Sequence, residues 1–161
     1  MPQDVSTDAP DDPADLTRYI ESRYHARHRE QLPKLASIAA TIEAVHAGHD
    51  KVPAGLAEIF RRLIGEMEVH MKKEELMVFP QIRKGGSPGL AALLVMMRAD
   101  HDDQDSEAVE IRRLTDGLTL PEDACSSWAT LYAETDQFLT DLAEHFRLEN
   151  DVLFPQFERK E

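Results

Sequence analysis

Hydrophobic residues recur at steps of three and four along four segments of the chain, which is the spacing of a buried helix face. The predicted helices span residues 16–47, 53–79, 88–116 and 121–158. Glycine and proline stand near their ends, and Ser87 followed by Pro88 predicts the start of the third helix. Because short connections favour antiparallel neighbours, this order predicts an all-α, up-down-up-down four-helix bundle.

Polar residues interrupt two of these apolar stripes near their carboxyl ends. His70 and Glu74 precede Met77 on the stripe of the second predicted helix, and His145 and Glu149 precede Val152 on that of the fourth. An ionised glutamate on a buried stripe costs several kcal/mol unless it is compensated. No lysine or arginine shares the stripe near either glutamate. We therefore predict that a metal ion compensates these charges in the bundle core.

A repeated phrase strengthens this prediction. His70-x-x-x-Glu74-x-x-x-x-Phe79-Pro80-Gln81 recurs 75 residues later as His145-x-x-x-Glu149-x-x-x-x-Phe154-Pro155-Gln156. A histidine and a glutamate four positions apart on a helix are separated by about 40° and roughly 6 Å, so both can reach one metal. His25 and His101 lie 45 and 44 residues before His70 and His145. In an antiparallel bundle all four histidines then lie at one level.

These spacings predict a dinuclear site with two histidines on each metal and two bridging glutamates. The predicted metal ligands are His25, His70, Glu74, His101, His145 and Glu149. Four imidazoles exceed the needs of one tetrahedral zinc and provide too much nitrogen for calcium or magnesium. Mixed imidazole and carboxylate ligation favours iron, although manganese, cobalt or zinc can occupy such sites. We expect two non-haem iron ions per chain, joined by an oxo or hydroxo bridge.

Other potential ligands have weaker signals. His28, three residues after His25, is expected to donate a hydrogen bond near the site and not to bind the metal itself. His49 follows a glycine and is expected to be solvated in a loop. Cys125 is expected to be a small buried residue.

Composition limits the partners and the compartment. The 161 residues carry a formal net charge of −13, which opposes binding to nucleic acid. No apolar run approaches the roughly 20 residues that cross a bilayer. The first fifteen residues contain five aspartates and no lysine or arginine, so we expect residues 1–15 to be a disordered acidic tail and residues 16–161 to form the bundle. A single cysteine suits the cytoplasm. We expect a monomer, bound neither to membranes nor to nucleic acid.

Several segments resemble the hemerythrin-like (HHE) proteins. They are Tyr24–Pro33, His70–Glu75, Asp100–Asp102, Ala124–Tyr132 and His145–Pro155. The phrases Tyr-His-x-x-His-Arg-x-x-Leu-Pro and Leu-Glu-Asn-x-Val-Leu-Phe-Pro resemble, more narrowly, the RIC family (repair of iron centres). That resemblance implies a di-iron centre with four histidines and two bridging glutamates, matching the six ligands above. Longer members carry a small N-terminal domain with a cysteine pair, and an acidic tail stands in its place here.

The resemblance also implies a function. RIC proteins help to restore iron-sulfur clusters damaged by nitric oxide or oxidants, and reaction of nitric oxide at the di-iron site is attributed to them. Nitric oxide, dioxygen and damaged iron-sulfur proteins are therefore the expected partners, and enzymatic turnover stays an open question. The alternative is a hemerythrin-like carrier or sensor that binds dioxygen or nitric oxide reversibly. A ferritin-like oxidase is disfavoured, because those sites use Glu-x-x-His motifs and more carboxylates.

Overall fold

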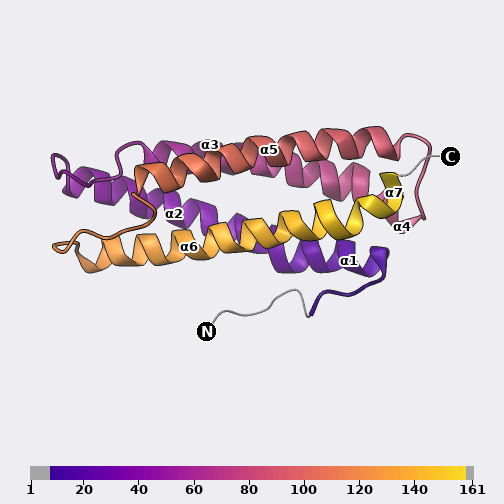
Figure 1. Cartoon of the computed structure of the whole chain (residues 1–161), viewed down its shortest axis with the longest axis horizontal. Coiled ribbons are helices and arrows are strands. Elements are labelled where there is room, and N and C mark those ends of the chain that lie inside the picture. Colours follow the sequence, from indigo (N-terminus) through magenta and orange to yellow (C-terminus); the bar gives the residue numbers. More distant parts are fainter. Residues whose placement is uncertain (1–7, 159–161) are drawn as a thin grey trace.

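Four long helical segments run side by side in alternating directions in the computed structural model, which describes residues 8–158 (Figure 1). The first segment contains α1 (Pro13–Ile20), the π-helical turn η2 (Glu21–His25) and α2 (Ala26–Val45). The second contains α3 (Leu56–Lys73), the π-helical turn η3 (Glu74–Val78) and α4 (Phe79–Arg83). The third is α5 (Leu90–Leu114), and the fourth contains α6 (Ser126–Arg147), the π-helical turn η4 (Leu148–Leu153) and α7 (Pro155–Glu158). The predicted all-α, up-down-up-down bundle is confirmed. No helix of the described residues is long and apolar enough to cross a membrane.

The helix starts differ from the predicted ones. Helix α1 begins at Pro13, because the Asp12 side chain accepts a hydrogen bond from the backbone N–H of Asp15 at 3.0 Å and caps the helix. Residues 13–15 thus belong to the bundle and not to a tail, while residues 1–7 lie outside the described part. Helix α5 follows Gly89 without a side-chain cap, so the predicted cap and first turn were wrong. Helix α6 begins at Ser126, five residues later than predicted.

Two π-helical turns explain where the stripe prediction failed. The backbone N–H groups of Phe79 and Phe154 donate to the carbonyls of Glu74 and Glu149, five residues earlier. Each π turn holds an extra residue and rotates the following positions around the axis. Met77 is therefore 47% exposed and Val152 is only partly buried, although both were predicted on the buried stripe. The second segment also continues through Pro80 to Arg83 and does not end at Phe79.

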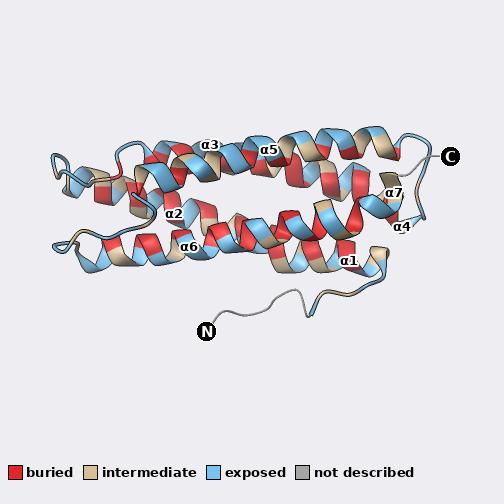
Figure 2. Ribbon diagram, in the orientation of Figure 1, coloured by how far each residue is buried: buried red, intermediate tan, exposed pale blue. Residues whose placement is uncertain are grey.

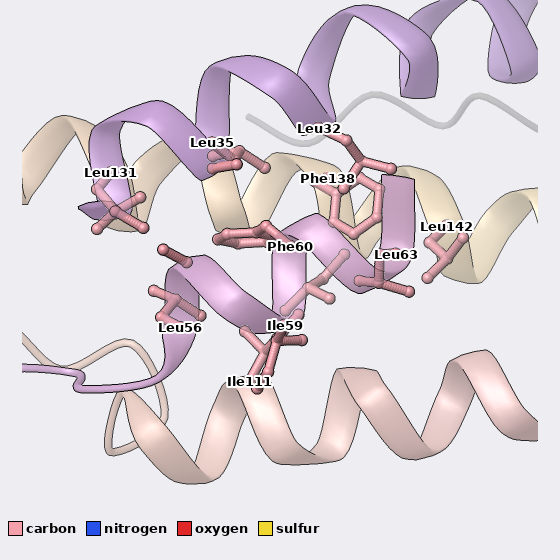
Figure 3. Packing of buried hydrophobic residues seen from close by; sticks show 14 of the residues in the cluster. Leu32, Leu35, Leu56, Ile59, Phe60, Leu63, Ile111, Leu131, Phe138 and Leu142 are labelled. Atoms are coloured by element: carbon pink, nitrogen blue, oxygen red, sulfur yellow. The ribbon is translucent and has the colours of Figure 1, made fainter. Parts of the chain in front are cut away.

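Buried residues lie on the inner faces of the four segments (Figure 2). Their apolar members form two clusters. One cluster lies around the edge-to-face pair of Phe60 and Phe138, whose ring centroids are 6.5 Å apart (Figure 3). The other contains Ile20, Phe79 and Phe154. The predicted ligands occupy the sequence positions where the two clusters meet, so apolar side chains enclose them from both ends of the bundle.

Replacing Phe60 by alanine should lower the free energy of unfolding by about 3–5 kcal/mol, because this fully buried ring would leave a cavity. Urea unfolding of the metal-free protein, followed by circular dichroism, measures the change. Val109→Ala on α5 is the control, since this residue is 68% exposed, and it should change stability by no more than about 0.5 kcal/mol. Equal losses in the two variants would contradict the assigned core.

Candidate metal centre

The six residues predicted as ligands meet at one level of the bundle. Each is at most 1% exposed. They form two groups, one with His25 and His145 and the other with His70 and His101, and both groups also contain Glu74 and Glu149. In each group one ligand atom per residue lies within 4.8 Å of all the others. The two groups therefore share both carboxylates.

In the first group, each of the two imidazoles lies against one oxygen of a different glutamate. The Nε2 atom of His25 lies 2.9 Å from Glu74 Oε1, and that of His145 lies 2.9 Å from Glu149 Oε2. His145 Nε2 is also 3.8 Å from Glu74 Oε1. The four atoms come from η2, η3, α6 and η4, so the π-helical turns carry three of these four residues.

The second group uses the other two carboxylate oxygens. His70 Nε2 lies 3.1 Å from Glu74 Oε2, and His101 Nε2 lies 2.8 Å from Glu149 Oε1. The Nε2 atoms of His70 and His101 are 3.1 Å apart. Each glutamate thus directs one oxygen into each group, which is the arrangement expected of bridging carboxylates.

The unpaired oxygens of the glutamates fit a cation better than a hydrogen-bond network. Among the described residues, Glu74 Oε2 and Glu149 Oε1 have no donor in hydrogen-bonding geometry, although imidazole nitrogens lie 2.8–3.1 Å away. Buried carboxylate oxygens need a partner, and a metal ion supplies one without requiring an N–H along the contact. A set of two imidazole nitrogens and two carboxylate oxygens suits iron, manganese, cobalt or zinc. The residues therefore fit two such cations.

The outer nitrogen of every predicted histidine ligand has its own partner. The Nδ1 contacts are His25 with Glu75 Oε2 at 2.7 Å, His70 with Asp100 Oδ2 at 2.9 Å, His101 with Asn150 Oδ1 at 2.8 Å and His145 with His28 Nε2 at 3.0 Å. An oxygen acceptor places the proton on Nδ1 and leaves the Nε2 lone pair for a metal. The supporting position predicted for His28 is where the structure places it.

Sequence reasoning missed the other three supporting residues. Each is the chain neighbour of a predicted ligand: Glu75 follows Glu74, Asp100 precedes His101, and Asn150 follows Glu149. Each nevertheless supports a histidine on another helical segment, so only the packed bundle reveals the pairing. Their polar character next to the ligands was the available signal.

Aromatic rings enclose the imidazoles. Tyr24 stacks on His145 with ring centroids 5.7 Å apart and an interplanar angle of 18°. Phe79 stacks on His25 at 5.8 Å, and Phe146 stacks on His101 at 4.1 Å. These rings restrict imidazole rotation and keep water from the carboxylates. The site is shielded from bulk solvent, which strengthens its electrostatic interactions.

Protons compensate the carboxylates when no cation does so. Burial opposes the charge on His25, but Glu74 and Glu75 outweigh it and raise the pKa of His25 to about 9. Burial likewise opposes the charge on His101, and Glu149 and Glu74 raise its pKa to about 10. Burial disfavours ionised Glu74, yet His70 and the other histidines hold the pKa of Glu74 well below its usual range. A metal entering this site must therefore displace protons from imidazoles.

The remaining histidines lie at the opposite end of α2 and do not join either group. His49 accepts a hydrogen bond from the Lys51 backbone N–H at 2.9 Å, and its Nε2 lies 3.0 Å from Asp123 Oδ1. His49 lies in a loop as expected, its side chain is 22% exposed, and its contact with Asp123 joins two loops. His46 Nε2 lies 3.3 Å from the sulfur of Cys125, which is exposed and not buried as expected, because it stands before the first turn of α6.

Comparisons with known proteins agree with this site. The family described as the hemerythrin HHE cation binding domain matches residues 18–157. The iron-sulfur cluster repair protein YtfE of Pectobacterium atrosepticum is 43% identical over 150 residues, which cover 92% of this chain and 67% of that protein. YtfE of Musicola paradisiaca is 42% identical over 147 residues (91% and 66%), and YtfE of Yersinia pseudotuberculosis is 41% identical over 146 residues (91% and 66%). The chain thus spans about two thirds of the length of these relatives.

The metal-free protein should lose stability as the pH rises. The raised pKa values of His25 and His101 contribute stability that is fully present below their usual pKa of 6.5 and is lost as the pH passes about 9 and about 10. The melting temperature of the metal-free protein should therefore fall between pH 6.5 and 10, as differential scanning calorimetry can measure. The metal-bound protein should change less over this range, because the cation replaces the protons. A flat profile for the metal-free protein would contradict the assigned proton positions.

Proposed function

Because the chain belongs to the family of hemerythrin HHE cation-binding domains, we propose that it is a di-iron protein that helps to repair or protect iron-sulfur clusters under nitrosative and oxidative stress. One observation carries the proposal: two groups of four buried ligands share both of their carboxylates, as a dinuclear centre requires. The names of the relatives, which are iron-sulfur cluster repair proteins, support the biological role.

The protein's own residues would hold two iron ions. His25 and His145 would bind one, His70 and His101 would bind the other, and the two glutamates would bridge them. When bound, iron supplies redox chemistry and coordination positions for a diatomic molecule such as nitric oxide. The supporting residues hold each imidazole in one orientation, and the aromatic rings exclude bulk water. Nitric oxide binding or reduction at this centre is the finer part of the proposal.

The enclosure of the site also favours reversible binding without turnover. All six ligands are at most 1% exposed, and aromatic rings stack on three of the four histidines. A hemerythrin-like carrier or sensor of dioxygen or nitric oxide would use the same protected site. A visible spectrum that changes on adding nitric oxide and returns on removing it, with no product formed, would select this second candidate.

Replacing Glu74 by glutamine should reduce the binding of both metals, because this carboxylate contributes one oxygen to each group. Metal analysis after anaerobic iron loading should find about two irons per wild-type chain and far fewer in Glu74→Gln. Reactivation of an iron-sulfur enzyme damaged by nitric oxide should fall at least about tenfold with the variant.

Glu58→Gln is the matched control, because Glu58 lies on the same helix with its side chain 61% exposed. It should retain both metals and full reactivation. Undiminished loading of Glu74→Gln would remove the bridging assignment. A fully loaded wild-type protein that fails to reactivate the damaged enzyme would contradict the repair function and leave the metal centre standing.

A further inference from the structure

The two metal positions have the same inner ligands but different surroundings. We propose that the iron bound by His70 and His101 is the one released to an acceptor, while the iron bound by His25 and His145 is retained. This inference rests on the proposed function. The inference comes from the residues that support each pair of histidines and from the cavities that border them.

A cross-linked set of side chains supports the His25 position. Arg29 on α2 donates to both oxygens of Glu75, at 2.9 and 3.2 Å. The same guanidinium donates to both oxygens of Glu68 on α3, at 2.8 and 3.2 Å. Because Glu75 in turn contacts His25 at 2.7 Å, one arginine fixes this imidazole and joins the two helical segments.

A buried chain of polar groups supports His145. His28 contacts Nδ1 of His145 through its Nε2 atom, at 3.0 Å. Its Nδ1 lies 3.4 Å from Gln31 Oε1, and Gln31 donates to Asp141 at 2.9 Å. His28 is 0% exposed and Asp141 is 1% exposed. Movement of His145 would therefore disturb hydrogen bonds between α2 and α6.

The support of the other position has fewer contacts on each supporting side chain. Asp100 contacts His70 at 2.9 Å and Lys73 at 3.0 Å. Lys73 lies on the same helix as His70, and Asp100 lies on α5, so a single ion pair joins the two helices here. His101 is supported by the neutral amide of Asn150. Arg98 donates to the backbone carbonyl of Asn150 at 2.8 Å, whereas Arg29 donates to both side-chain oxygens of Glu75.

The cavities differ in the same direction. A groove of about 910 Å³ between α3 and α5 is lined by Lys73, Asp100 and Gln104. The cavity behind the His25 position is about 250 Å³ and is bordered by His28, Arg29 and Glu68, two of which pair with each other. Water and a metal acceptor therefore have more room beside Asp100, which supports His70, than beside His28, which supports His145.

Gln104 provides a free acceptor on this route. It lies one helical turn after His101, is 3% exposed and lines the groove, and its Oε1 has no hydrogen-bond partner among the described residues. A buried amide oxygen without a partner can accept from the water of a hydrated cation. On release, the iron would exchange its two imidazole and two carboxylate ligands for ligands of the acceptor, and its oxidation state would not change.

Chelator kinetics test this proposal. Protein loaded anaerobically with two ferrous ions per chain is mixed with ferrozine, and the coloured complex is followed over time. We expect two phases of equal amplitude, one iron each. Asp100→Asn should accelerate only the fast phase, by about tenfold, because loss of a supporting carboxylate weakens metal binding by about 10–100-fold. Asp103→Asn, a charge-matched control in the same groove, should leave both rates within about twofold.

The His28 variants assign the slow phase. His28→Leu removes the acceptor for His145 and should accelerate the slow phase alone, while His28→Gln restores an acceptor and should return the rate close to wild type. Circular dichroism confirms that each variant is folded. Two irons leaving in a single phase, or acceleration of the fast phase by His28→Leu, would overturn the proposal and leave the di-iron centre intact. Loading of fewer than two irons in the wild type would instead contradict the proposed function, and this inference with it.

Discussion

The burial of two glutamates at the centre of the helical bundle is the constraint on which the rest of the structure depends. Glu74 and Glu149 are both completely buried, and isolated charges in such a place are costly. Four imidazoles converge on them and can give up protons to make room for cations. The supporting residues orient the imidazoles, and the aromatic rings keep water away. The neighbouring side chains either offset the charges of these carboxylates or shield them from bulk solvent, where electrostatic interactions would be weaker.

The sequence predicted which six polar residues meet in the core, because they repeat with helical spacing. His70 and Glu74 lie on one helix face, and the same pair recurs at His145 and Glu149. The π-helical turns were missed, since the stripe prediction assumed one constant period, and Met77 was misplaced as a result. A signal existed in the Phe-Pro pair that follows both glutamates. The i to i+5 hydrogen bond ends at the phenylalanine, and the proline has no N–H to continue an ordinary helix.

The support of the ligands could not be predicted in the same way, because it depends on contacts across the bundle. Arg29 joins Glu68 and Glu75 only after α2 and α3 have packed together. The chain from His28 to Asp141 requires the packing of α2 against α6. These differences make two positions with the same inner ligands inequivalent. A repair protein that must both keep a working centre and provide iron could use such a division, with one metal held for chemistry and the other available for transfer.

The most direct test of the central claim is a crystal structure of the iron-loaded protein with anomalous diffraction measured at the iron edge. The account predicts two iron peaks per chain at a separation of about 3.5–4 Å, as in other two-metal sites. One should lie between His25 and His145, the other between His70 and His101, with an oxygen of Glu74 and of Glu149 bound to each. A single peak, or peaks at the histidines near the other end of the bundle, would contradict it.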